Sequence, residues 1–491
     1  MFHRWWICPL LLLSSLAFAD AKPKPNRSEQ AHPSTLPVTT SSAEARRSFE
    51  HAMRNFEDYR LNESLQHLRE AAKADPKFAQ AFILIAKISK DPVEQAAARR
   101  RAKSLAPEVS PGEQLLIRWL AGAQEDDYIP AIAAMNDLLA MYPDDHRLAF
   151  LAGGWLNGRE RYQQAEVVLQ HALTLFHDYP AALNDLAYSY AFSGDFDKAF
   201  AAMERYVALE PDEPNPHDSY GEILRMAGKL DAALEQYRMS VHIDPNFGSE
   251  LGIADTYALM GREQDARDEY DRAIVFAGTQ SDKIQYELQK AVTWIRENNR
   301  KQAEKALSDV GKHAHAAGLA FYEAEAQRVL AMYEPDFKSA LKHLQLAQQI
   351  LQEPHELSES DRSDEQARIL RVQATRAAEA KDVQTAVEAL NQLQAMTEKS
   401  RSQVVQLCYH GAAGAVLVAQ DEPAEAISHL EENSNDPLSM RLLWRAYSST
   451  GATAQAQALA AELAALNLPT VEQALVVPQF RATLLSQAAH P

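Results

Sequence analysis

The sequence predicts an all-α solenoid built of antiparallel helix pairs. The main observation is a period of 34 residues, because Tyr128, Tyr162, Phe196 and Leu230 are evenly spaced and an alanine stands three positions after each. A fixed period of this length is typical of stacked supersecondary units rather than of one globular core. Composition agrees, since helix-forming Ala, Leu, Glu, Gln and Arg are abundant and the 491 residues include only 17 glycines.

Residues 1–19 have the pattern of a secretory signal peptide. Arg4 precedes an apolar run over residues 7–18, and Ala17-Phe18-Ala19 forms a small-residue cleavage site. The run is too short to cross a bilayer easily, which takes about 20 residues. We therefore expect an exported protein, periplasmic or secreted, with no stable membrane insertion after cleavage. The alternatives are cleavage after Ala21 rather than Ala19, and an uncleaved segment that anchors the chain.

Residues 20–42 are rich in Pro, Ser and Thr and lack apolar periodicity, so they are expected to form a flexible linker. The chain has two cysteines, Cys8 and Cys408. Removal of the signal would leave one, so no intrachain disulfide is expected. Cys408 lies in an apolar helical run, which favours a buried hydrophobic role over a catalytic thiol.

Residues 43–278 are expected to form an N-terminal array, with its regular units within 128–275. Ahead of them, Ser64, Leu68 and Pro76 fall at the positions of a degraded unit. The basic run at residues 99–103 is interpreted as a solvated helix face. A formal net charge of −19 disfavours a nucleic acid partner, because phosphates would be repelled.

Small residues explain how the two helices of a unit approach closely. In one unit Ala187 stands on the first helix and Ala199 on the second, and larger side chains fill the space above them. Gly194, Gly228 and Gly261 are predicted to end first helices, where a left-handed residue is favoured.

The unit at residues 180–213 reads, in order, Leu183, Leu186, Ala187, Tyr190, Gly194, Ala199, Met203 and Pro211. This pattern resembles the tetratricopeptide repeat. The resemblance is specific over 128–275 and fades elsewhere. It implies a right-handed superhelix of helix pairs, and the signal peptide would place it in a bacterial-type envelope.

Beyond residue 278 the period loosens. Residues 279–465 are expected to form degenerate helix pairs, with an exposed acidic loop over 352–365. Residues 466–491 are expected to form a capping helix and tail, interrupted at Pro478.

No catalytic motif stands out. The sequence has no Gly-rich phosphate loop, G-x-S-x-G elbow or H-E-x-x-H motif. His313 and His315 are two positions apart, so on a helix they would point to different faces and would not form a ligand pair. We therefore expect that the chain is not an enzyme and that it has no cofactor and no metal site.

The resemblance implies that the first helix of each unit lines a concave groove. The groove positions are Asn184, Asp185, Tyr188 and Phe192 in one unit, Asp218, Ser219, Glu222, Arg225 and Met226 in the next, and Leu251 and Asp255 in the third. Acidic and aromatic side chains of this kind would suit a protein or peptide that carries basic and apolar residues.

The predicted function is a non-enzymatic scaffold or adaptor that binds a partner segment in this groove. Two alternatives stay open: a regulatory module that senses a ligand or peptide through the C-terminal half, and a repeat protein that associates with itself. The partner and the oligomeric state do not follow from the sequence.

Overall fold

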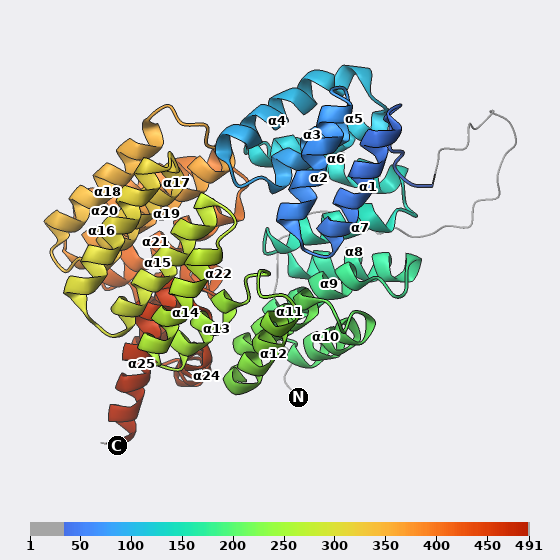
Figure 1. Ribbon diagram of the computed structural model, residues 1–491. Coiled ribbons are helices and arrows are strands. Elements are labelled where there is room, and N and C mark those ends of the chain that lie inside the picture. The colour runs from blue at the N-terminus through green and yellow to red at the C-terminus, as the bar shows by residue number, and fades with distance from the viewer. Residues whose placement is uncertain (1–33, 490–491) are drawn as a thin grey trace, which may run out of the picture. The chain divides into compact units, whose positions relative to one another are not determined.

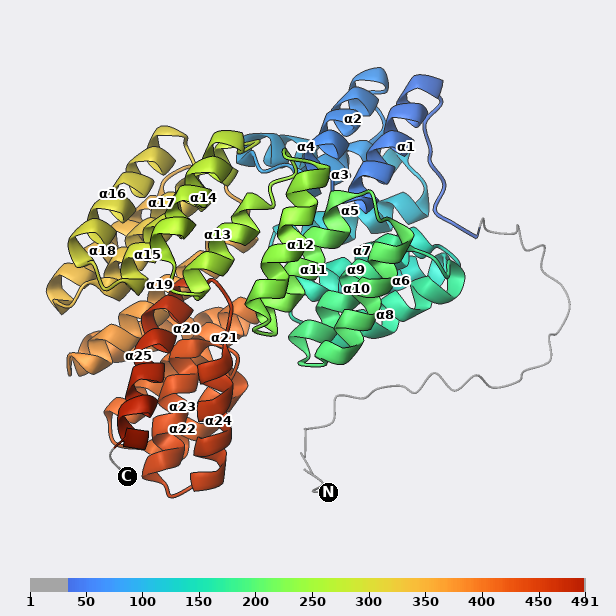
Figure 2. The same ribbon diagram turned by 60° about the horizontal axis from the view of Figure 1, so that its bottom comes forward.

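The computed structural model describes residues 34–489, and these residues form α-helices, one short 3-10 helix and no strand. Successive helices pack against one another from α1 to α24, mostly as antiparallel pairs (Figure 1). The chain is therefore an all-α solenoid, as predicted. The second view shows the same order of pairs around the molecule (Figure 2).

The first fourteen helices are α1 (Ala43–Glu57), α2 (Leu61–Ala74), α3 (Ala79–Ile88), α4 (Pro92–Leu105), α5 (Pro111–Gln124), α6 (Tyr128–Met141), α7 (His146–Asn157), α8 (Tyr162–Leu175), α9 (Pro180–Phe192), α10 (Phe196–Leu209), α11 (Pro214–Met226), α12 (Leu230–Ile243), α13 (Glu250–Leu259) and α14 (Glu263–Phe276). The 3-10 helix η1 (Ala106–Glu108) follows α4.

The remaining helices are α15 (Gln280–Arg296), α16 (Arg300–Ala316), α17 (Ala320–Tyr333), α18 (Phe337–Gln352), α19 (Glu359–Glu379), α20 (Val383–Lys399), α21 (Gln403–Ala419), α22 (Pro423–Glu432), α23 (Pro437–Ser449), α24 (Thr453–Ala465) and α25 (Val471–Ala489). The last of these packs back against α15 and α23.

The 34-residue period marks the starts of second helices. Tyr128, Tyr162, Phe196 and Leu230 are the first residues of α6, α8, α10 and α12. The alanine three positions after each of them has no exposed surface. The complete burial of these alanines confirms the predicted register of the units. A small side chain is needed at these positions because two helices meet there.

The space around the glycines shows how closely the helices approach each other. A Cβ on Gly153 of α7 would lie 2.4 Å from Cγ of Leu169 on α8, so only hydrogen fits there. Gly194, Gly228 and Gly261 follow α9, α11 and α13 with φ of +80°, +75° and +75°. These left-handed residues end the first helices, as expected.

Three expectations need correction. Residues 34–42 are not a free linker, because Leu36 N–H donates to Asp145 (2.8 Å) and Gln80 donates to the Pro37 carbonyl (2.6 Å). The acidic loop is shorter than expected, since α19 already begins at Glu359. Helix α25 continues through Pro478, because its neighbours Val477 and Phe480 are buried and their packing outweighs the lost backbone hydrogen bond.

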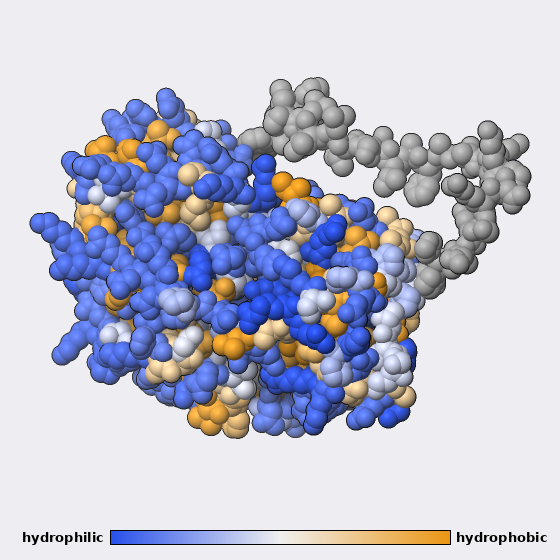
Figure 3. Space-filling view, turned by 90° about the horizontal axis from the view of Figure 1, so that it is seen from above, coloured by the Kyte–Doolittle hydropathy of each residue, from blue (hydrophilic) through white to orange (hydrophobic). Residues whose placement is uncertain are grey.

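The predicted signal peptide and the first part of the predicted linker, residues 1–33, lie outside the described residues. The molecular face seen in Figure 3 is mostly hydrophilic, with small and separate hydrophobic areas. Among residues 34–489, no helix is long and apolar enough to span a bilayer.

Candidate functional site

The predicted groove residues lie on three consecutive first helices, α9, α11 and α13, which contact one another. A network of side-chain hydrogen bonds and ion pairs, which we call the polar ladder, joins these helices. The Tyr188 hydroxyl donates to Glu222 (2.7 Å), and Arg225 donates to Glu222 (2.9 Å) and to Asp255 (2.9 Å). Tyr270 of α14 donates to the other oxygen of Asp255. The structure therefore brings together predicted residues from all three units.

Arg225 and Asp255 form an ion pair inside the array, with 4% and 6% of their surfaces exposed. Burial raises the pKa of Asp255, and the guanidinium of Arg225 opposes that rise. Burial likewise raises the pKa of Asp218 to about 6. These charged groups hold α11 against α13 and are mostly withdrawn from solvent.

The turn between α1 and α2 lies over one end of this surface. The Tyr59 hydroxyl donates to Asp185, although the two residues are 126 positions apart. Tyr59 has a φ of 58°, a backbone conformation that bulky residues seldom adopt. The adjacent Arg60 donates to Glu213 (2.9 Å) and Asp244 (3.0 Å). Burial raises the pKa of Asp185 to about 6.

The predicted groove residues differ in accessibility. Those that are buried are Asn184, Ser219, Arg225 and Asp255. Those that are partly exposed are Asp185, Tyr188, Asp218, Glu222, Met226 and Leu251. Phe192 is 42% exposed, and its ring stacks on that of Tyr162 with centroids 5.0 Å apart. We call Tyr188, Phe192, Glu222, Met226 and Leu251 the accessible strip.

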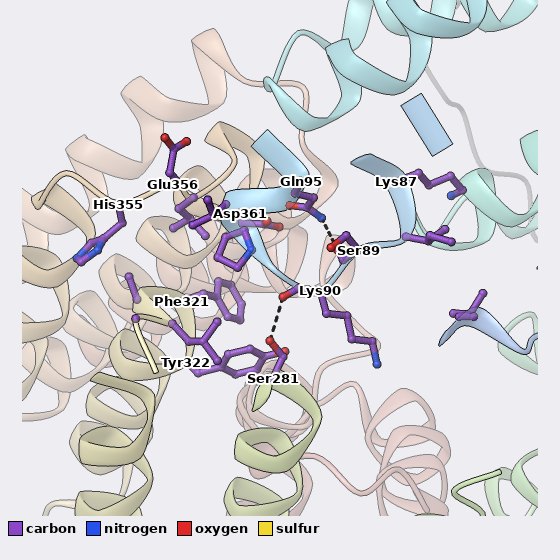
Figure 4. A pocket seen from close by; sticks show the side chains of 18 of the residues that line it. Lys87, Ser89, Lys90, Gln95, Ser281, Phe321, Tyr322, His355, Glu356 and Asp361 are labelled. Atoms are coloured by element: carbon purple, nitrogen blue, oxygen red, sulfur yellow. Dashed lines mark hydrogen bonds between the residues drawn. The ribbon is translucent and has the colours of Figure 1, made fainter. Parts of the chain in front are cut away.

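A cavity of about 490 Å³ lies where the α3–α4 connection meets α15, α17 and the segment before α19 (Figure 4). Ser281 donates to the Lys90 carbonyl (3.0 Å), and the Lys90 ammonium pairs with Asp282. Gln95 donates to the Ser89 carbonyl (3.0 Å). These bonds hold the α3–α4 connection, which lines the cavity, in place.

The cavity walls are mixed in character. Phe321 and Tyr322 supply apolar surface, and burial raises the pKa of Tyr322 to about 12. Lys87 lines the cavity as well, and burial lowers its pKa. Glu356 lies at the opposite side in Figure 4 and pairs with Arg100 of α4 at 3.0 Å. Such a surface can hold polar and aromatic groups of a ligand.

Reactive chemistry is sparse in the described residues. Cys408 is buried, and burial raises the pKa of its thiol to about 11, which keeps it protonated. His313 pairs with Glu287 and His315 pairs with Glu323, so the two rings do face different partners. Within residues 34–489, no group of three or more His, Cys, Asp or Glu side chains could hold a metal ion.

By its fold, the chain belongs to the stacked helical repeat arrays. The repeat units of such arrays present continuous surfaces for other proteins. Residues 156–223 match the tetratricopeptide repeat family. This segment resembles tetratricopeptide repeats, and arrays of such repeats are in general protein–protein interaction scaffolds. No curated protein matches the chain.

Several solved structures are similar to this chain at low sequence identity. The APC/C heterotetramer Cut9–Hcn1 aligns with 84% of this chain and 78% of its own, at 17% identity and a TM-score of 0.40. Yeast Tom70 aligns with 84% of this chain and 96% of its own, at 15% identity and a TM-score of 0.41. The type IV pilus biogenesis factor PilW aligns with 42% of this chain and 96% of its own, at 19% identity and a TM-score of 0.30.

Sequence reasoning missed the cavity in Figure 4 and the cover that Tyr59 provides. Both depend on segments far apart in the chain, such as Lys90 and Asp282, which are 192 positions apart. The repeat period reports only neighbouring units, so it holds no signal for these contacts. The spacing of Arg368, Arg371 and Arg376 is a signal in the sequence that places several arginines on one helix.

Proposed function

We propose that the chain is a non-enzymatic scaffold that binds an extended segment of a partner protein along the accessible strip. The observation that carries this proposal is the exposure of Phe192 beside Tyr188 and Glu222 on the first helices of two neighbouring units. Exposed aromatic side chains next to a carboxylate are typical of interface anchors. The polar ladder lies behind the accessible strip and fixes the positions of its helices, which supports the proposal.

The strip favours a partner segment with an apolar anchor and basic residues. Phe192, Met226 and Leu251 offer apolar contact, and the Glu222 side chain is 38% exposed. Asp185 and Asp218 add negative charge behind it. A Lys or Arg in the partner would gain from this field, and the net charge of −19 would speed its approach.

The experiment replaces two aromatic residues together, Tyr188→Ala with Phe192→Ala, and measures capture of partners from a native extract by mass spectrometry. We expect the captured proteins to fall at least about tenfold, since truncation of an interface anchor costs 2 kcal/mol or more. The control is Phe276→Ala, because Phe276 is also exposed (56%) but ends the second helix α14. Equal capture by both variants contradicts the proposal.

A folding control is needed because Tyr188 also bonds Glu222. Phe192→Ala alone leaves that hydrogen bond intact and should still weaken capture. If Phe192→Ala retains full capture while the melting temperature is unchanged, the partner binds elsewhere on the chain.

A further inference from the structure

A second cavity, of about 240 Å³, lies in the C-terminal half and is lined by an unusual number of arginines. Its charged and polar walls are formed by Arg328 of α17, Arg368, Arg371 and Arg376 of α19, Arg441 of α23 and Glu472 of α25. Only Glu472 and Glu379 contribute negative charge to the lining. The cavity therefore has an excess of cations in a chain that is strongly acidic overall.

Three of the five arginines are already bound by protein groups. Arg328 donates to Glu365 (2.7 Å), and Arg371 pairs with Asp436. Arg376 donates to main-chain carbonyls, including that of Ala331 (3.1 Å). These side chains are fixed in position and frame the cavity.

The other two lack comparable partners. Arg368 comes no closer than 3.6 Å to a carboxylate, that of Glu365. Arg441 makes no hydrogen bond or ion pair with any group among residues 34–489. Burial lowers its pKa, and the charges of Glu379 and Asp436 only partly offset that effect. A guanidinium withdrawn from water without a directly hydrogen-bonded counter-ion is costly, and an anion in the cavity would lower that cost.

A neighbouring cavity of about 350 Å³ shares Arg368, Arg371 and Glu472 with the first. The two spaces therefore lie on either side of the same arginine side chains of α19.

We propose that this arginine cavity binds a compact organic dianion, a dicarboxylate or a phosphate ester. Planar guanidinium groups match the oxygens of carboxylate and phosphate. Arg441 makes no hydrogen bond and Arg368 makes only a long ion pair, so both have N–H groups left to donate. The volume is below the roughly 300 Å³ at which pockets begin to hold drug-sized ligands, which favours a small molecule. Apolar walls from Met332, Val372 and Leu438 would contact a short carbon skeleton. The proposal does not rest on the accessible strip or on its partner.

The test measures the melting temperature of the full chain in succinate and, separately, in glycerol 3-phosphate, each against sodium chloride at equal ionic strength. The two arms distinguish a carboxylate ligand from a phosphate ligand. We expect a saturable rise of several degrees in at least one arm, since a ligand that binds only the folded state stabilises it. No rise above chloride in either arm overturns the proposal.

Variants locate the site. Arg441→Gln should weaken dianion binding about tenfold or more, because a charge-assisted hydrogen bond is lost. It should destabilise the free protein little, since Arg441 has no hydrogen bond to lose. Arg445→Gln is the matched control, because Arg445 is exposed one turn further along α23. Equal binding by both variants overturns the proposal.

Glu472→Gln should have the opposite effect on dianion binding. Glu472 lines the cavity and raises the pKa of Arg328 and Arg371 by its charge. Its neutralisation should strengthen dianion binding several-fold, because a like charge is removed from the site. A purely structural role would not produce tighter binding, so weaker binding counts against the proposal.

Discussion

Replacement of Arg225 by methionine should strongly destabilise the central units. Arg225 is 4% exposed and donates to both Asp255 and Glu222 at 2.9 Å. Methionine keeps much of the side-chain volume but leaves the Asp255 carboxylate without its cation. Breaking a buried ion pair from one side costs about 3–5 kcal/mol.

The control is Arg262→Met, which breaks a pair of similar length, 2.7 Å, to Asp265. Those two side chains are 50% and 49% exposed, so water screens the interaction. The expected loss is about 0–1 kcal/mol. The contrast between the two variants isolates the effect of burial from that of charge removal.

The assay is urea unfolding combined with hydrogen exchange of α11 and α13, because repeat arrays need not unfold in one step. Asp255→Asn should restore part of the stability lost in Arg225→Met, since it removes the unpaired charge. The loss should also be smaller at pH 5 than at pH 8. A carboxyl with a raised folded-state pKa contributes stability at low pH and loses it as pH rises through that pKa.

Two results would refute this reasoning. One is a loss below about 1 kcal/mol for Arg225→Met, which would place the pair among weak surface interactions. The other is a loss that Asp255→Asn does not reduce, which would show that the packing of the arginine stem, not its charge, was decisive.

Two further predictions concern pH and the N-terminus. Burial raises the pKa of Asp185 to about 6, and burial together with nearby acidic groups raises the pKa of Glu210 to about 7. Both carboxyl groups should therefore stabilise the folded state at low pH. This stabilisation should be lost as the pH rises through 6 to 7. The melting temperature should therefore be higher at pH 5.5 than at pH 8, and Glu210→Gln should reduce the difference; an unchanged difference contradicts the role of that group. If the chain is exported, N-terminal sequencing of the mature protein should begin at Asp20 or Lys22, whereas an intact N-terminus in a membrane fraction would indicate an anchored protein.

The accessible strip shows how far a resemblance can place residues on the fold. Position within the repeat correctly predicted which residues lie on α9, α11 and α13. It did not predict that Asn184 and Ser219 would be buried. Whether the strip binds a partner stays a prediction for the Phe192 experiment.

The sequence by itself determined the helix pairs and their register. Ala131 and Ala199 are fully buried, and Gly194 is left-handed, because each unit packs mainly on the next and the period of apolar and small residues specifies that packing. Only the tertiary structure decided which distant units meet. Tyr59 reaches Asp185, and Arg441 reaches the cavity beside α19, through contacts that the local period does not encode. The arginine cavity and the covered end of the strip depend on those contacts, since side chains from four helices must converge before a binding site exists.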